Sequence, residues 1–361
     1  MNDQKKLLSL LPKGFEDLLP PDAETEFRGI GILMKCFARF GYERVKPPLV
    51  EFEDSLFAPG PGAALADQTF RMMDPQSEKM LALRSDITPQ IARIATSRMD
   101  NAALPLRLAY ANDAVRTRAS QQRTFRQFAQ VGCELVGAPE GDDVIEMAVV
   151  ALKGLAELKI QNVTIDFSLP DIFEALIKAT DIAEGDLDGL RAQIAGEASS
   201  AIAKIEDLGL EPVAAEQVVK LKSVIERVRE AVEALGVKHV SYSVDPIETK
   251  GFEYHSGVVF TLFSKDAHGE LGRGGRYAID CDDQSCQGFA AGFTLYMDTV
   301  RMAMPALSRK KRVFVSFDTN WGVLEELHDE GFVTVRGKAY GDEALLGTCT
   351  HIYKDGKVVE V

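Results

Sequence analysis

The spacing of apolar residues predicts an amphipathic helix near the start of the chain. Across residues 24–40 the apolar positions recur with the period of an α-helix that buries one face, and Gly41 then ends the pattern. Residues 42–51 alternate like a strand, but Pro47 and Pro48 lack backbone donors. We therefore expect this second stretch at a sheet edge or at an interface with another subunit.

Shorter elements follow in an irregular order. The pattern predicts strands at residues 69–72, 80–84, 106–111 and 127–135, with a helix at about 88–99. This order is typical of an antiparallel or mixed sheet rather than a doubly wound parallel one. The expected fold class is α+β, with helices flanking the sheet.

Residues 171–235 differ in character from the rest of the chain. Between Asp181 and Glu233 there are twelve acidic and six basic residues, a local charge of −6, and no aromatic residue. Apolar residues from Val218 to Leu235 keep the spacing of a packed helical seam. We interpret the segment as a helical insertion whose seam closes its own small bundle; the alternative is a helix that docks a partner.

Strand patterns resume at residues 237–244 and 258–263, and the sequence Arg273-Gly-Gly-Arg-Tyr predicts a tight turn beside a strand. After Lys311 a strand, a helix and a strand precede a hairpin with Asp355-Gly356 at its turn. The predicted domains are a core of residues 1–170 and 236–308, the insertion 171–235, and a small C-terminal α/β unit, 309–361.

Composition narrows the function classes. The 361 residues include 41 basic and 55 acidic ones, a formal net charge of −14, which argues against a broad surface for a polyanion. Five scattered cysteines predict reduced thiols in a cytoplasmic protein, and Cys281 and Cys286 lack the second ligand pair that a zinc site needs. The sequence contains neither a signal-peptide pattern nor an apolar run of about 18 residues, so no membrane segment is expected.

A basic cluster stands out in this acidic chain. Between residues 107 and 126 one acid, Asp113, accompanies five arginines: Arg107, Arg116, Arg118, Arg123 and Arg126. Guanidinium groups donate in a planar fork that suits carboxylate and phosphate. The cluster is a candidate anion site; the alternative is a solvated basic loop.

The strand that follows carries a polar face. Its alternation places Gln130, Gly132 and Glu134 on one side, where the glycine would leave room for a ligand. Asp86 and Thr88 add an acid and a hydroxyl, although either residue could instead cap the next helix. Acids facing arginines suit an α-amino acid, whose ammonium would face carboxylates and whose carboxylate would face arginine.

Several of these segments together resemble the catalytic core of histidyl-tRNA synthetase, a class II synthetase, over about residues 10–304. The segments are Leu83-Arg-Ser-Asp-Ile-Thr-Pro-Gln, Phe125-Arg-Gln-Phe-Ala-Gln-Val-Gly-Cys-Glu-Leu, Lys250-Gly-Phe-Glu-Tyr-His and Gly272-Arg-Gly-Gly-Arg-Tyr. Gly41-Tyr-Glu-Arg-Val-Lys-Pro-Pro resembles the dimer-forming first class II motif. The part after Lys311 resembles a shortened anticodon-binding domain.

Departures from the family pattern bear on catalysis. Arg116 matches the arginine that contacts the α-phosphate, but the acid two residues later is Arg118. The ATP-binding arginine of the last motif falls on Thr299, and the histidyl-specific arginine falls on Lys250, which lacks bidentate geometry. These replacements together predict that the chain does not adenylate an amino acid.

The amino-acid pocket of the family persists by resemblance, although its acid at position 86 is usually Glu. The resemblance implies histidine binding by Asp86, Thr88, Arg116, Gln130, Glu134, Lys250, Tyr254 and His255. It implies no catalytic residue, no metal and no cofactor.

These features are similar to the family of regulatory subunits of ATP phosphoribosyltransferase. The resemblance implies a partner, the short-form catalytic subunit, a dimer through the class II core, and histidine as the feedback ligand in the first step of histidine biosynthesis. Neither tRNA nor a membrane is an expected partner. The alternatives are a divergent active histidyl-tRNA synthetase and an amino-acid-binding paralogue with another partner.

Overall fold

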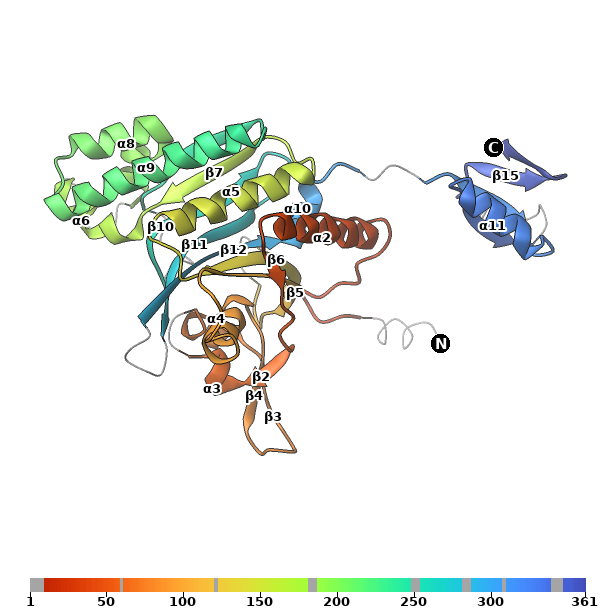
Figure 1. Ribbon diagram of the computed structural model, residues 1–361, viewed down its shortest axis with the longest axis horizontal. Coiled ribbons are helices and arrows are strands. Elements are labelled where there is room, and N and C mark those ends of the chain that lie inside the picture. The colour runs from red at the N-terminus through yellow and green to blue at the C-terminus, as the bar shows by residue number, and fades with distance from the viewer. Residues whose placement is uncertain are drawn as a thin grey trace. The chain divides into compact units, whose positions relative to one another are not determined.

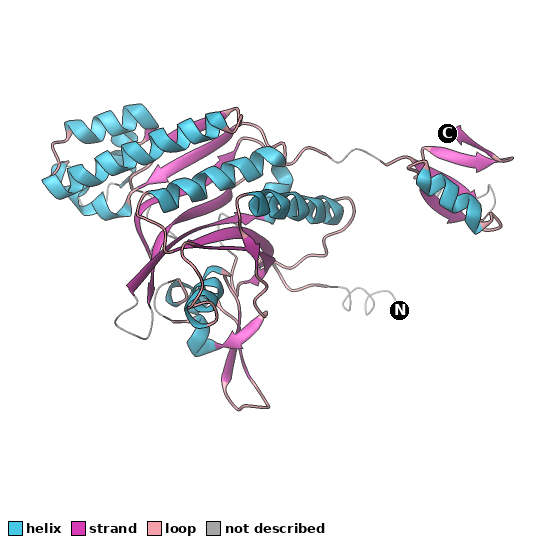
Figure 2. Ribbon diagram, viewed as in Figure 1, coloured by secondary structure: helices cyan, strands magenta, loops and turns pink. Residues whose placement is uncertain are grey.

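The chain folds into two compact units, Met1–Pro305 and Ala306–Val361. A computed structural model describes residues 10–58, 61–119, 123–180, 187–247, 254–280, 287–306, 310–338 and 347–361. Figure 1 labels the elements along the chain, and Figure 2 distinguishes helices from strands.

The first unit is built on a nine-stranded mixed sheet. Its strands, in spatial order, are β1 (Glu43–Arg44), β5 (Leu106–Val115), β6 (Gln127–Val136), β12 (Gln287–Tyr296), β11 (Glu270–Asp280), β10 (His255–Ser264), β7 (Val163–Ser168), β9 (Val240–Val244) and β8 (Gly196–Glu197). Neighbours from β5 to β7 pair antiparallel, whereas β1 and β9 pair parallel with β5 and β7. The predicted α+β class with a mixed sheet is confirmed.

Helices cover both faces of this sheet. Figure 1 shows α2 (Asp22–Arg39), α5 (Asp142–Glu157) and α9 (Pro212–Ala234) on one side and α4 (Thr88–Ser97) on the other. Alternate side chains of β5 point to opposite faces of the sheet. Ala109 belongs to the core under α5, whereas Leu108 and Tyr110 pack with Ile91 of α4 on the other face. This division leaves one face of β6 for the α5 core and the other for polar residues. Helix α10 (Met297–Ala303) follows β12.

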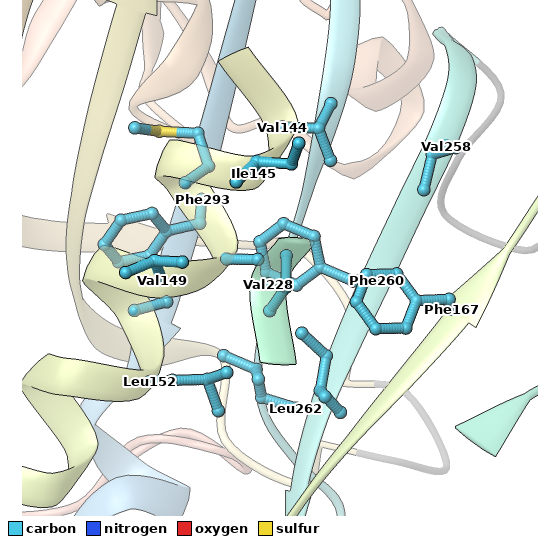
Figure 3. Close-up of a cluster of buried hydrophobic side chains, with 14 of the residues drawn as sticks. Val144, Ile145, Val149, Leu152, Phe167, Val228, Val258, Phe260, Leu262 and Phe293 are labelled. Carbon is cyan, nitrogen blue, oxygen red and sulfur yellow. The ribbon is translucent and has the colours of Figure 1, made fainter. Parts of the chain in front are cut away.

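The apolar seam of α9 is buried, as predicted. It packs against the main core as well as against helices of its own segment. Val218, Leu221, Ile225, Val228 and Val232 are buried in the same apolar cluster as the sheet residue Phe260. Figure 3 draws Val228 with Phe260, Phe167 and residues of α5 as members of this cluster. The helix packs against α5 of the core as well as against α8 (Ala198–Asp207). The seam therefore joins the 171–235 segment to the main core.

The rest of that segment is also mostly helical. It contains the turn η2 (Pro170–Ile172), α6 (Phe173–Ala179) and α7 (Leu187–Ile194), and its short strand β8 pairs with β9 at the sheet edge. The exact bounds of an insertion, 171 and 235, stay a prediction. None of the helices in the described ranges is long and apolar enough to cross a membrane.

A small antiparallel sheet stands beside α4. Its spatial order is β2 (Val50–Phe52), β4 (Met80–Leu83) and β3 (Arg71–Met73), and α3 (Glu53–Leu56) and η1 (Ala63–Gln68) connect its first two strands in the chain. The strand predicted across residues 42–51 is thus only two short pieces, β1 and the start of β2, separated by the prolines. The edge position expected for it is confirmed, because β1 is the outermost strand beside β5.

The tight turn predicted at Arg273-Gly-Gly-Arg-Tyr is wrong. These residues lie in the middle of β11, paired with β10 on one side and β12 on the other. A Cβ on Gly274 would lie 2.6 Å from the ring of Phe260, and one on Gly272 would lie 2.8 Å from Leu295. The glycines permit close packing across the sheet rather than a reversal of the chain.

The second unit is a small α/β layer. Its sheet has the order β14 (Val333–Gly337), β13 (Arg312–Ser316), β15 (His351–Lys354) and β16 (Lys357–Glu360). Val313 and Val315 pack against Leu324 and Leu327 of α11 (Trp321–Asp329). The predicted hairpin turn is confirmed, because Asp355-Gly356 joins β15 to β16 with φ values of 49° and 76°.

Candidate functional site

A cavity of about 380 Å³ lies on the sheet face opposite α5. It is lined by residues from seven places in the chain: η1, the start of α4, the connection after β5, and strands β6, β10, β11 and β12 (Gln68, Asp86, Thr88, Arg116, Arg123, Glu134, Tyr254, His255, Glu270, Arg273, Tyr277, Gly292, Thr294 and Tyr296 among them). Six of the eight predicted site residues line this cavity. The two exceptions are Gln130, which is buried behind it, and Lys250, which is outside the described residues.

Glu134 is the more deeply buried of the two buried acids that line the cavity, with 1% of its surface exposed against 9% for Glu270. Tyr277 donates its hydroxyl to Oε2 at 2.8 Å, and Thr88 donates to Oε1 at 2.9 Å. The Tyr110 hydroxyl lies 3.5 Å from Oε1. Burial raises the pKa of Glu134 to about 8, although the three hydroxyl donors act in the opposite direction. Burial thus favours the protonated form of this carboxyl group.

Asp86 is held in place by the residues on both sides of it. Its Oδ1 accepts a hydrogen bond from the backbone N–H of Thr88 at 3.0 Å, as expected of a helix-start acid. Its Oδ2 accepts from Gln130 Nε2 at 3.0 Å, and the Gln130 amide oxygen accepts from the Ile87 N–H at 3.1 Å. Gln130 thus positions Asp86, while the Thr88 hydroxyl is directed to Glu134 rather than to a cap.

The role predicted for Gly132, leaving space for a ligand, is wrong. A Cβ at this position would lie 2.6 Å from the Tyr110 hydroxyl and would overlap the carbonyl oxygen of Phe293. Protein atoms fill that space. The glycines that line the site are Gly274 on β11 and Gly292 on β12, and a Cβ on Gly292 would overlap the carboxylate of Glu134.

The five arginines that cluster in sequence separate in space. Only Arg116 and Arg123 line the cavity. Arg107 forms a bidentate pair with Glu146 of α5 at 2.9 Å, on the other side of the sheet. The Arg126 guanidinium lies over the rings of Phe15 and Phe70. Arg118 is exposed. A single five-arginine anion site is therefore wrong, because strand alternation and a loop disperse the side chains.

The guanidinium groups of the cavity are paired with acids. Arg116 Nη2 lies 3.7 Å from Asp86 Oδ2, and its Nε donates to the carbonyl of Ser85. Arg123, 6% exposed, pairs with Asp298 and lies 3.8 Å from Glu270. Its guanidinium also lies 3.9 Å from the centre of the Tyr296 ring. These contacts fix the arginines in the free chain.

Sequence reasoning missed Glu270, Arg273 and Tyr277 as site residues. Arg273 Nε donates to Glu270 Oε2 at 2.9 Å, and both side chains line the cavity. The signal was present as strand alternation in Arg273-x-x-x-Tyr277, which puts the two side chains on one face. The assumed turn concealed it.

Two rings close another wall of the cavity. The rings of Tyr254 and His255 lie 4.1 Å apart with 30° between their planes, and Tyr277 meets Tyr254 edge-on at 6.0 Å. Burial lowers the pKa of His255 to about 3, and the charge of Arg273 acts in the same direction. His255 is therefore neutral at physiological pH and presents a ring rather than a charge.

Thr299 has a structural task. Its buried hydroxyl donates to the carbonyl oxygens of Glu270 at 2.6 Å and Tyr296 at 3.1 Å, at the start of α10. The position thus supplies no cation to the cavity. In the described ranges no three His, Cys, Asp or Glu side chains gather as metal ligands; Cys281 and Cys286 lie outside those ranges.

The charges of the cavity suit a small zwitterion. Asp86 and Glu134, with their hydroxyl neighbours, can accept from a cationic group, and Arg116, Arg123 and Arg273 can donate to a carboxylate. Besides the paired charges, aromatic rings, the aliphatic side chains Ala64 and Leu65, and Gln68 line the walls. This combination of a few polar groups in an aromatic cavity is typical of small-molecule sites.

Comparison with known proteins identifies the family to which the chain belongs. The family model described as histidyl-tRNA synthetase matches residues 14–225 and 210–300. The ATP phosphoribosyltransferase regulatory subunit of Rhodospirillum centenum is 41% identical over 378 residues, covering 98% of this chain and 97% of the relative. The corresponding subunit of Gluconobacter oxydans is 36% identical, with 96% of each chain covered.

Solved structures agree on the fold. A regulatory subunit/histidyl-tRNA synthetase from Bacillus halodurans C matches with a TM-score of 0.75 at 20% identity, covering 96% of this chain and 97% of that one. Histidyl-tRNA synthetase from Nostoc sp. PCC 7120 matches with a TM-score of 0.72 at 16% identity, covering 98% and 96%. The class II synthetase-like fold is thereby confirmed. The chain belongs to the histidyl-tRNA synthetase-like family of ATP phosphoribosyltransferase regulatory subunits.

Proposed function

We propose that this regulatory subunit binds histidine in the cavity around Glu134 and thereby reports histidine to a separate catalytic subunit of ATP phosphoribosyltransferase. The regulatory role follows from the family, and the chain is not itself the catalyst. The observation that carries the ligand assignment is that two acids, Asp86 and Glu134, and two arginines, Arg116 and Arg123, line one cavity.

The cavity matches the chemistry of histidine. Its volume of about 380 Å³ accommodates one amino acid. The ammonium would face the acids, the carboxylate would face the guanidinium groups, and the imidazole would lie among Tyr254, His255 and Tyr277. Lys250 stays a predicted contact that lies outside the described residues.

An active synthetase is the less supported alternative. Thr299 uses its hydroxyl on backbone carbonyls, and Arg118 is exposed where the resembled pattern has an acid that contacts ATP. Neither residue offers the charge arrangement that an adenylating site requires. Histidine-dependent exchange of pyrophosphate into ATP by the purified chain would contradict our proposal.

Regulation requires a difference in affinity. Histidine can inhibit only if it binds the inactive assembly more tightly than the active one, and a coupling of about 1–3 kcal/mol gives a roughly 5- to 150-fold effect. The regulatory subunit would transmit this difference through its contact with the catalytic chain.

The proposal includes a catalytic partner and a second copy of this chain, and it excludes tRNA. The names of the relatives imply a separate catalytic chain, and we propose that it is the short-form catalytic subunit. Dimerisation is supported by Leu49 and Phe52, which are 45% and 44% exposed beside the segment that resembles the first class II motif. The net charge of −14 supports a chain without tRNA binding. A cytoplasmic location also remains a prediction.

Reconstitution tests the regulatory role most directly. The purified chain should co-migrate with a short-form catalytic subunit, raise its turnover and make it sensitive to histidine. Absence of both co-migration and activation would refute the role, and would favour a paralogue with another partner.

Calorimetry tests the placement of the ligand. Glu134→Ala and Gln130→Ala should each weaken histidine binding, because one removes the buried acid and the other removes the support of Asp86. The matched control is Glu157→Ala, since Glu157 pairs with Arg39 and Lys153 outside the cavity. Unchanged affinity in both site variants would reject this placement.

A further inference from the structure

Glu134 is surrounded by hydroxyl groups and not by cations. Tyr277 on β11, Thr88 at the start of α4 and Tyr110 on β5 all direct hydroxyls at its carboxyl group. Among the described residues no lysine or arginine forms an ion pair with it. A buried carboxylate without a positive partner is costly, and hydroxyl donors offset only part of that cost.

The cations of the same cavity are engaged by other acids. Arg116 lies beside Asp86, whereas Arg273 pairs with Glu270. Arg123 lies between Glu270 and Asp298. The arginines that line the cavity thus form two groups with acids other than Glu134, and no described lysine or arginine pairs with Glu134 itself.

The remaining groups that face Glu134 do not supply the charge. Asp86, the nearest acid, disfavours ionisation of Glu134, and Thr294 on β12 bonds to Tyr110 at 2.7 Å. Gly292 faces the carboxyl with backbone alone, and Cys133 beside it on β6 is buried with a raised thiol pKa because of that burial. His255 lines the same cavity as a neutral ring.

We infer that Glu134 carries a proton in the empty site and releases it when a cationic group of the ligand takes the proton's place. This inference rests on the proposed histidine-binding function and names what the site recognises, a ligand that arrives with an ammonium-type charge. The Glu134 O–H bond breaks, the proton passes to the solvent, and the ligand cation becomes the counter-charge of the carboxylate. Net charge in the buried site is conserved.

The exchange makes binding dependent on pH in a defined direction. Protons compete with the ligand, so raising the pH removes the competitor and strengthens binding. From about pH 6.5 the affinity for histidine should rise by up to tenfold for each pH unit. The rise should level off near pH 8, where burial places the pKa of Glu134.

Calorimetry of the full chain counts the protons. Histidine is titrated at about pH 7 in phosphate and in Tris, whose different ionisation enthalpies reveal proton transfer to the buffer. The expected result is release of close to one proton for each bound histidine. Histidinol, which keeps the ammonium group, should also release a proton, whereas N-acetylhistidine, which lacks it, should bind at least about tenfold more weakly.

Two variants and an infrared measurement test whether the released proton comes from Glu134. Glu134→Gln keeps the shape without a transferable proton, so it should bind weakly, release no proton and lose the pH dependence. Glu157→Gln, a matched change at a paired glutamate outside the cavity, should behave like the parent. If Glu134→Gln does not bind measurably, infrared difference spectra of the parent should show loss of a protonated carboxyl band on addition of histidine.

The outcomes separate the two proposals. Binding of histidine without proton release, or without loss of the protonated carboxyl band, overturns the proton exchange and leaves histidine binding intact. Proton release that persists unchanged in Glu134→Gln also overturns it. If the parent binds no histidine at all, the proposed function fails, and the exchange fails with it.

Discussion

At the scale of single residues, the contact between Gly292 and Glu134 determines whether the buried carboxyl fits. A Cβ at position 292 would overlap both carboxylate oxygens, and β11 and α4 hold the acid from the other sides. The absence of one side chain on β12 is thus a condition for the buried acid on β6.

We therefore predict that Gly292→Ala forces the Glu134 carboxyl to move. The free energy of unfolding should fall by about 1–3 kcal/mol, as for other overpacked sites, and histidine binding should weaken. Denaturant unfolding and calorimetry measure the two effects. Gly288→Ala is the matched control, because it lies on the same strand with no atom within 4 Å of its Cβ, and its unfolding free energy should change by less than about 0.5 kcal/mol. Equal losses in the two variants would contradict the prediction.

The sequence predicted those site residues that the alternation of a single strand places on one face. Alternation along β6 placed Gln130 and Glu134 on one face, and the structure agrees. Alternation says nothing of which other strand meets that face. The Tyr277 hydroxyl at Glu134 comes from a strand 143 residues further along the chain, so only the folded sheet could identify it.

At the scale of elements, α9 shows that a correctly predicted helix period does not identify the elements against which the helix packs. The seam spacing predicted a packed helix, and the buried valines confirm that. The spacing did not say whether the seam faces its own segment or the main sheet. In the folded chain Val228 belongs to the same buried cluster as Phe260 of β10, and α9 packs against α5 (Figure 3).

A pair of identical substitutions on α9 tests this packing. Val228→Ala, at a fully buried position, should lower the free energy of unfolding by about 1–3 kcal/mol because it removes two methyl groups and leaves a cavity. Val219→Ala on the same helix, 61% exposed, should change it by less than about 0.5 kcal/mol. Urea unfolding of both variants measures the difference; similar values would mean that the α9 seam is not part of the main core.

The prediction of a turn at the glycine-rich segment 272–275 was wrong for a physical reason. Glycine is frequent both in turns and in strands that approach one another closely, and the local sequence does not separate the two cases. The neighbours Phe260 and Leu295, which fill the space beside these glycines, are distant in sequence.

At the scale of the whole molecule, all residues that line the cavity belong to the first compact unit. The second unit has its own small core of valines and leucines. A chain that ends at Pro305 should therefore keep its affinity for histidine within about threefold, since the cavity loses no lining residue. Calorimetry on the shortened and the full chain tests this. A loss of tenfold or more would show that the second unit supports the site.

The sequence by itself determined the periodic elements, the α+β class, the acidic charge and the family motifs, because these depend on residues that are neighbours along the chain. Only the tertiary structure decided which charges meet. It separated five sequence-adjacent arginines, brought Tyr277 to Glu134, and paired Arg123 with Asp298. Those contacts depend on which strands lie side by side in the sheet and on which face each side chain falls. The balance of charges that suggests proton exchange at Glu134 is therefore a property of the fold.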